Sequence, residues 1–321
     1  MKNILVTGGA GFLGSNFVTK TVNDYPDSQI TVLDKLTYAG TKSNLEPVID
    51  KINFIVGDIL DQQIVDELMP KADLVVHFAA ETHNDRSLLS PYIFFETNIL
   101  GTHNLVRSAL NHDVHFHHVS TDEVFGDLPI KSREKFNEDS PYNPSSPYSA
   151  SKAGSDHLVR SFVRSFGLKA TITNCSNNFG INQYWEKFIP NSIRSVLKGE
   201  SIKLYGTGEN VRDWIHVDDH TDGIWAAILN VNQGETYLLG GDNEISNIEL
   251  AKLILSEMGE AEDIVEFVSD RPGHDRRYAI DFGKATSELG WSPNKSDFGK
   301  QISALVSFYS NKSKKEEMEK E

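Results

Sequence analysis

Cysteine is almost absent from this 321-residue sequence, because Cys175 is the only one. A single cysteine cannot form an internal disulfide, and no cysteine and histidine residues have metal-ligand spacing. These absences argue against a secreted disulfide scaffold and a structural zinc module, so we expect no metal. Basic residues are also outnumbered, 31 against 46 acidic ones, which gives a net charge of −15. Because like charges repel, we expect no nucleic-acid partner.

Long apolar runs are missing as well. The first residues, MKNILVTGG, lack the apolar region of a secretory signal, and no stretch of ~18 uninterrupted apolar residues is present to span a bilayer. We therefore expect a soluble cytoplasmic protein with no membrane partner. The last residues, KSKKEEMEKE, carry charges of both signs and little to bury, which predicts a solvated or frayed tail.

What the sequence does have is a series of short apolar runs separated by longer segments with helical character. Runs that are apolar throughout are typical of parallel strands with helices on both faces of the sheet. The first half is therefore predicted to be a doubly wound α/β fold, with a crossover helix at 97–111. The predicted strands lie at 4–7, 30–34, 53–57, 74–79 and 114–120.

After residue 174 the pattern becomes irregular. A long loop is predicted at 177–190, helices near 191–198 and 246–258, and a strand within 236–241. No low-complexity linker separates these elements from the first half, so the second half reads as a cap interleaved with the sheet domain.

Three glycines follow the first strand in the run TGGAGFLG. Gly8, Gly11 and Gly14 lie directly before a predicted helix. Glycine lets the backbone turn tightly and approach a pyrophosphate, which the N–H groups of Phe12 and Leu13 would then bind. A glycine turn that serves only packing is the alternative for these residues taken alone.

The second predicted strand ends at Asp34, twenty residues beyond Gly14. A carboxylate there can accept hydrogen bonds from both ribose hydroxyls of a dinucleotide, and it would repel a 2′-phosphate. The pattern thus favours NAD over NADP, with a turn-capping Asp34 as the alternative. Two later strand ends extend the site: Asp58 and Ile59 beside the adenine, and Ala79 and Ala80 where the backbone approaches the cofactor.

Tyr148 and Lys152 stand four residues apart after Pro147, so they share one face of a predicted helix. A lysine ammonium and an oxidised nicotinamide would lower the pKa of the tyrosine toward neutrality, which makes Tyr148 a base for an alcohol. Lys152 would also hold the nicotinamide ribose. By itself this spacing is common for a surface pair, and it gains meaning from the glycine motif that precedes it.

The order of TGGAGFLG, Asp34 and YSASK resembles the extended short-chain dehydrogenase/reductase family, which implies a Rossmann-type fold with a smaller C-terminal substrate-binding domain. Further motifs narrow the resemblance to nucleoside-diphosphate-glucose 4,6-dehydratases. They are AAETHNDRS (79–87), STDEVFGD (120–127), NCSNNFG (174–180), NVRDWIHVDDH (210–220) and RPGHDRRYAID (271–281). We expect 1–173 and 211–243 to bind NAD, and 174–210 and 244–321 to bind a sugar nucleotide.

The run STDEV falls where the fifth strand ends, at the sheet edge where open α/β folds bind ligands. Loss of water needs a base for one proton and an acid for the departing hydroxyl, and adjacent carboxyl groups can fill both roles. An exposed acidic turn is the alternative. With roles carried over from the resemblance, Tyr148 and Thr121 act on the C4 hydroxyl, Glu123 removes the C5 proton, and Asp122 protonates the C6 hydroxyl.

The resemblance also implies dTDP-glucose as substrate, with UDP-glucose and other nucleotide sugars left open, and a homodimer that pairs through 92–110 and 148–166. A sugar-nucleotide 4-epimerase, which needs no carboxyl pair, and an inactive NAD-binding scaffold are the rival functions. Phe125 and the loop at 181–185, which lacks two prolines, depart from the family pattern. Remaining cofactor candidates are Lys35, Thr37, Thr97 and Asn178; substrate candidates are Thr82, Asn177, Lys187, Phe188, Tyr205, Arg212, Arg271 and, as a loop residue only, His274.

Overall fold

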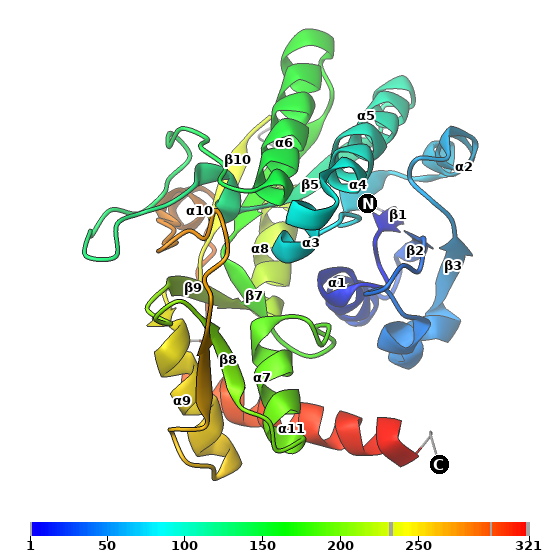
Figure 1. Cartoon of the computed structure of the whole chain (residues 1–321). Coiled ribbons are helices and arrows are strands. Elements are labelled where there is room, and N and C mark those ends of the chain that lie inside the picture. The colour runs from blue at the N-terminus through cyan, green and yellow to red at the C-terminus, as the bar shows by residue number, and fades with distance from the viewer. Residues whose placement is uncertain (1, 231–233, 296, 319–321) are drawn as a thin grey trace.

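A seven-stranded parallel sheet forms the centre of the protein in a computed structural model, which describes residues 2–230, 234–295 and 297–318 (Figure 1). The strand order is β10-β6-β5-β4-β1-β2-β3. The order reverses direction between β1 and β4, and the predicted doubly wound α/β fold is thus confirmed. The strands are β1 (Asn3–Thr7), β2 (Gln29–Asp34), β3 (Ile52–Val56), β4 (Leu74–His77), β5 (His115–Thr121), β6 (Ala170–Cys175) and β10 (Thr236–Leu239).

Helices cover both faces of this sheet. Successive strand residues point to opposite sides, so the residues on both sides of a strand are buried under helices. Ile4 and Val6 belong to one buried cluster and Leu5 to the other. The strands consequently read as continuous apolar runs in the sequence. The first face carries α1 (Phe12–Asp24), η1 (Lys42–Lys51), α8 (Val217–Leu229) and α10 (Gly283–Leu289); the second carries α2 (Gln62–Leu68), η2 (Met69–Lys71), α5 (Thr102–Asn111) and α6 (Pro147–Phe166).

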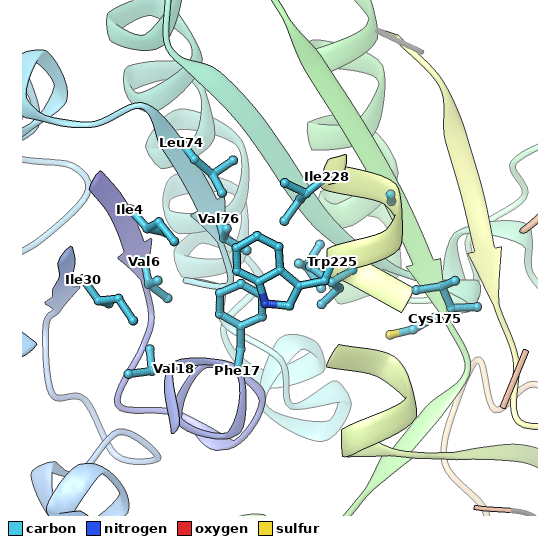
Figure 2. Close-up of a cluster of buried hydrophobic side chains, with 14 of the residues drawn as sticks. Ile4, Val6, Phe17, Val18, Ile30, Leu74, Val76, Cys175, Trp225 and Ile228 are labelled. Atoms are coloured by element: carbon cyan, nitrogen blue, oxygen red, sulfur yellow. The ribbon is translucent and has the colours of Figure 1, made fainter. Parts of the chain in front are cut away.

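Phe17 of α1 and Trp225 of α8 meet over the first face, where Figure 2 shows them among branched aliphatic side chains of the strands. Their rings stack with centroids 5.5 Å apart, and the Trp225 indole N–H donates to Thr21 Oγ1 at 3.0 Å. Complete burial of a side chain such as Phe17 contributes about 1.5–3 kcal/mol. The contact therefore fixes α1, and with it the glycine turn that precedes α1, against the sheet.

The connection from β4 to β5 is less regular than the single helix predicted at 97–111. It runs through α3 (Asn84–Leu89), α4 (Pro91–Phe95) and a π-helical turn, η3 (Glu96–Gly101), before α5 begins. Asn98 in this turn donates to the Glu81 carbonyl at 3.0 Å and to Ser151 Oγ at 2.8 Å. These contacts join the turn to the end of β4 and to α6, and π-turns of this kind are frequent at functional sites.

The later part of the chain forms a smaller unit at the lower end of the sheet in Figure 1. One buried cluster holds it together, with Ile189, Trp214, Leu250 and Ile302 among its members. The elements are β7 (Asn177–Phe179), β9 (Val211–His216) and β11 (Glu244–Ser246) in one sheet; β8 (Ile202–Tyr205) and β12 (Val265–Val268) in another; and the helices α7 (Phe188–Leu197), α9 (Asn247–Met258) and α11 (Phe298–Met318).

Two sequence predictions about this unit were wrong. The expected loop at 177–190 contains β7, which pairs with β9, and it ends in the first turn of α7. The expected frayed tail is helical as far as Met318, and 319–321 lie outside the described residues. Tyr309 ties this helix to the chain after β7, because its hydroxyl donates to the carbonyls of Gly180 and Gln183 at 3.1 and 2.9 Å.

The predicted segment 211–243 divides between the two units. Its first strand, β9, lies in the three-stranded sheet, whereas α8 packs on the large sheet and β10 extends it. The assignment of whole segments to domains stays a prediction.

Within the described ranges, no helix combines the length and apolar content required to cross a bilayer.

Candidate active site

The glycine turn between β1 and α1 is packed so closely that side chains would not fit. Gly8 has φ of +71°, and a Cβ on it would lie 2.5 Å from the Ala79 nitrogen of the neighbouring strand end. A Cβ on Gly14 would lie 2.3 Å from the Gly8 carbonyl oxygen. The turn can hold its course only with glycine, and it places the first amides of α1 at the rim of a large cavity.

Asp34 ends β2 at the same cavity and is nearly buried. One of its carboxylate oxygens accepts the Ala10 N–H at 2.9 Å and the other accepts the Leu36 N–H at 2.8 Å. Burial raises the pKa of Asp34 although these two bonds lower it. Asp34 therefore does hold the turn together, as the alternative interpretation supposed, while still facing the cavity where a ribose would lie.

Every residue predicted to bind the cofactor borders this one cavity. Lys35 and Asp58, at the part of the cavity predicted to hold the adenine, form an ion pair in which Lys35 Nζ lies 2.6 Å from Asp58 Oδ2. The residues are Gly8, Gly11, Phe12, Leu13, Gly14, Asp34, Lys35, Thr37, Asp58, Ile59, Ala79, Ala80, Thr97, Tyr148, Lys152 and Asn178. The individual role of each stays a prediction.

Tyr148 and Lys152 project from the first turns of α6 into the cavity and are both buried. The helix begins with Ser146 as its N-cap, in a capping box with Ser149. Lys152 Nζ donates to the Val119 carbonyl of β5 at 2.9 Å. The ammonium is thus held between the helix and the central sheet, at the end of the strand that leads to the carboxyl pair.

The protein's own groups leave the pKa of Tyr148 well above its usual value. Burial raises the pKa, and the nearby Glu123 raises it further, while a hydrogen bond with Thr121 lowers it. The sequence expectation of a pKa near neutrality also counts the positive charge of an oxidised nicotinamide, so it stays a prediction.

The carboxyl pair begins η4 (Asp122–Phe125), immediately after β5, and both members border the cavity. Asp122 is 1% exposed, and among the described residues its Oδ2 has no hydrogen-bond partner. Burial, Glu123 and Asp213 raise the pKa of Asp122 well above its usual value, against opposing effects from Arg212 and Thr121. These surroundings favour the protonated form of Asp122, which suits it to donate a proton.

Glu123 has a different environment from its neighbour. It is only half-buried, and its Oε2 accepts a hydrogen bond from Asn84 Nδ2 at 2.8 Å. Thr121 Oγ1 accepts the Glu123 backbone N–H at 3.2 Å and donates to Asp122 Oδ1 at 3.3 Å. Asp122 thus has one oxygen without a partner among the described residues and a raised pKa, whereas Glu123 is held by the Asn84 amide, and these different surroundings suit the two groups to opposite proton transfers.

Three of the predicted substrate residues line the cavity, and five do not. Lys187 lies in the loop after β7, and its Nζ donates to the Thr82 carbonyl at 2.9 Å. This bond holds the loop against the segment that follows β4. Thr82, Asn177 and Lys187 are the lining residues, whereas Phe188, Tyr205, Arg212, Arg271 and His274 lie outside the lining set.

Arg271 and Tyr205 nevertheless converge beside this cavity on Asp85. Arg271 Nη1 lies 3.3 Å from Asp85 Oδ1, and the Tyr205 hydroxyl donates to Oδ2 at 3.0 Å. Arg271 and Asp85 both act on the pKa of Lys187, so the cluster lies close to the lining. The Arg86 guanidinium, next to Asp85 in the chain, lies over the Tyr38 ring, 3.8 Å from its centroid.

Arg212 lies outside the cavity lining. It is 5% exposed, and it donates to the carbonyls of Val211 and Asp275 at 2.7 and 2.8 Å while its guanidinium lies over the Tyr278 ring. These bonds use two of its five N–H donors, and its role in phosphate binding stays a prediction. His274 likewise pairs with Asp270, at 2.7 Å.

Several residues of the site were missed from the sequence. Asn84 lies within the motif AAETHNDRS, but nothing in that run indicates that its carboxamide reaches Glu123. The loop after β7 contributes more lining than expected because it folds back across the cavity. The missed lining residues with polar groups include Glu81, Cys175, Ser176, Gln183, Tyr184 and Glu186.

Comparison with known proteins gives a consistent pattern. A family model described as GDP-mannose 4,6 dehydratase matches residues 5–302. A dTDP-glucose 4,6-dehydratase of Mycolicibacterium smegmatis is 50% identical over 95% of this chain and 92% of its own length. The crystal structure of DesIV, a dTDP-glucose 4,6-dehydratase from Streptomyces venezuelae with NAD bound, superposes with a TM-score of 0.93 at 43% identity, covering 96% of this chain and 97% of that one.

A UDP-glucose 4-epimerase from Thermotoga maritima is also similar in fold. It has a TM-score of 0.89 at 27% identity and covers 97% of this chain and 99% of its own. The overall fold is therefore shared by proteins with both names, and the residues of the site must distinguish the two reactions.

Proposed function

The chain belongs to the GDP-mannose 4,6-dehydratase family, and on that premise we propose that it converts dTDP-glucose to dTDP-4-keto-6-deoxyglucose as an NAD-dependent hydro-lyase. One observation carries the choice of reaction. A buried Asp122 with a raised pKa and a hydrogen-bonded Glu123 stand side by side in the cavity that Tyr148 and the glycine turn also border. A 4-epimerase would need Tyr148 but would have no use for the two carboxyl groups.

The residues around the cavity fit NAD on structural grounds. Glycine at 8 and 14 lets the turn pack against Ala79 and against itself, which brings the start of α1 to the cavity wall where a pyrophosphate would bind, and Asp34 faces the position of a ribose. Tyr148 and Lys152 lie at the opposite end of the lining, where the nicotinamide would lie. When bound, NAD supplies oxidation at C4 of the sugar and reduction at C6.

The chain's own side chains supply the proton transfers. Tyr148, which hydrogen-bonds Thr121, would act as the phenolate favoured by the positive charges of Lys152 and of a bound oxidised nicotinamide, and in that form it takes the proton of the C4 hydroxyl. The resulting 4-ketone acidifies the C5–H bond, so Glu123 can remove that proton. Asp122 gives its proton to the C6 hydroxyl, which leaves as water. Because elimination requires both transfers, the environments that separate the two carboxyl groups are part of the reaction.

Recognition of the nucleoside diphosphate is assigned to the cations that border the sugar end of the cavity. Lys187 lies in the lining, and Arg271 lies beyond it with its guanidinium on Asp85. A diphosphate between them would replace water around both cations and compete with Asp85 for Arg271. Thr82 and Asn177 complete the polar wall on this side, while Phe188, Tyr205 and His274 are proposed to act from the surrounding layer.

The proposal is tested by incubating the purified protein with the dTDP, UDP, CDP and GDP forms of glucose. We expect dTDP-glucose to give the highest kcat/KM, and mass spectrometry of the product to show loss of one water. An isomer of unchanged mass, inverted at C4, would instead identify an epimerase. A higher kcat/KM with another nucleotide would overturn the choice of substrate but leave the reaction intact.

A homodimer is also proposed, because large apolar side chains on α3, α4 and the end of α6 are exposed. Leu89, Tyr92 and Phe166 are 86%, 69% and 62% exposed. Exposed large apolar side chains on these helices support an interface there, and identical chains most often pair about a twofold axis. Sedimentation velocity should give twice the chain mass, and Leu89→Glu should shift the protein toward monomer. A monomeric wild type would contradict the pairing.

With a single free, buried cysteine, the protein is further proposed to work in the cytoplasm.

A further inference from the structure

Asn84, the first residue of α3, lies between two parts of the active site that are far apart in sequence. Its Nδ2 donates to Glu123 Oε2 at 2.8 Å, and its Oδ1 accepts the Ser146 hydroxyl at 2.7 Å. The donor and the acceptor of one carboxamide are thus both used. Asn84 is half-buried and its backbone carbonyl accepts the Ser87 hydroxyl, which holds the residue at the start of α3.

The two partners of Asn84 belong to the two halves of the proposed chemistry. Glu123 follows β5 and is assigned the C5 proton. Ser146 is the N-cap of α6, the helix that carries Tyr148 and Lys152. The carboxamide therefore fixes the distance between the carboxyl pair and the start of the catalytic helix, and it does so with a group that does not ionise.

We propose that Asn84 is a positioning residue that aims the Glu123 carboxylate at C5 of the sugar, an inference that rests on the proposed dehydratase function. A glutamate side chain has several rotatable bonds, and this one is half-buried beside an open cavity. Among the described contacts, the Asn84 amide is the side-chain donor that holds Glu123. A misplacement of about 1 Å in a reacting group can cost on the order of 100-fold in rate.

The inference predicts which step suffers when the contact is lost. C4 oxidation depends on Tyr148, Lys152 and Thr121, none of which hydrogen-bonds to Asn84, whereas removal of the C5 proton depends on Glu123. Asn84→Asp keeps the shape and the acceptor for Ser146 but replaces the donor with a second carboxyl group. Asn84→Ala removes both bonds. Both variants should therefore slow removal of the C5 proton. Only Asn84→Ala should also lose the hydrogen bond to Ser146 at the N-cap of α6.

The test measures the two half-reactions separately in the holoenzyme. Rapid mixing with dTDP-glucose follows the absorbance of the reduced nicotinamide, and NMR in deuterated water follows exchange at C5. We expect both variants to lower kcat about 10- to 100-fold, with little change in KM. The reduced nicotinamide should form at the wild-type rate and then accumulate, while deuterium enters C5 more slowly than in the wild type.

Ser146→Ala is the matched control, because it breaks the other hydrogen bond of the carboxamide and removes the cap of α6. It should lower the melting temperature without accumulation of the reduced nicotinamide. If the Asn84 variants exchange C5 at the wild-type rate, or slow nicotinamide reduction as much as overall turnover, the positioning role is wrong. A wild type that yields no dehydrated product would instead reject the dehydratase function itself.

Discussion

Tyr148→Phe should lower kcat by about 10²- to 10⁴-fold, the usual contribution of a positioned acid or base. The phenol is the one group at the helix end of the cavity that both hydrogen-bonds Thr121 and lies where the C4 hydroxyl would be bound. Without its oxygen the first proton has no acceptor, so no later step can begin. Rapid mixing of the loaded enzyme with dTDP-glucose should therefore show no burst of reduced nicotinamide.

The ring itself is retained in this variant, including its edge contact with Phe94 at 6.4 Å between centroids. Folding should consequently be little affected. Tyr237→Phe provides a control of identical chemistry at a buried tyrosine of β10 that does not border the cavity. Its hydroxyl donates to Glu288, so the control should lose about 1 kcal/mol of stability and keep its turnover. A Tyr148→Phe enzyme with more than a tenth of wild-type turnover would remove Tyr148 from the mechanism.

The large sheet and the cofactor end of the site were predictable because both follow from local sequence. Apolar runs such as 30–34 mark strands buried on both faces, and a polar residue at the end of such a run lies at the ligand-binding edge. Asp34 and Asp122 are placed in this way. The glycine turn is local in part, because the close approach that requires Gly14 is made by the carbonyl of Gly8 in the same turn, whereas the one that requires Gly8 is made by the distant Ala79.

The sugar end of the site depends on contacts between distant segments, and there the sequence was less informative. Nothing in the sequence near Arg212 indicates that the carbonyls of Val211 and Asp275 accept two of its donors. Asp85 gathers Tyr205 and Arg271 from segments more than a hundred residues away. Residue type and spacing cannot indicate which of several partners a cation will meet once the chain has folded.

The division of labour between Asp122 and Glu123 illustrates the same limit. Adjacent carboxyl groups predict an acid and a base, and the resemblance suggested which is which. The physical cause is burial: Asp122 points where no donor reaches its Oδ2, whereas Glu123 reaches the Asn84 amide. The raised pKa of Asp122 is thus a property of the folded surroundings, and it can be measured through folding stability.

Asp122→Asn should abolish most turnover and change how stability depends on pH. Loss of the acid that protonates the C6 hydroxyl should lower kcat about 10²- to 10⁴-fold, while C4 oxidation continues and the reduced nicotinamide accumulates. The pKa of Asp122 is raised in the folded state, so the folded protein binds a proton that the unfolded chain releases at lower pH. Its contribution therefore lowers stability as the pH rises from the unfolded pKa, near 4, toward the folded one.

Asparagine cannot lose a proton, so the Asp122→Asn variant should lack the fall in stability that Asp122 contributes as the pH rises. The stability of Asp122→Asn relative to wild type should increase with pH through this window, by at most about 1.4 kcal/mol per pH unit. Chemical denaturation of both proteins at a series of pH values measures the difference, in which the other groups facing Asp122, namely Glu123, Asp213 and Arg212, largely cancel. A difference that does not change with pH would mean that Asp122 is ionised when folded, and it would then be a base beside Glu123 rather than the acid that elimination requires.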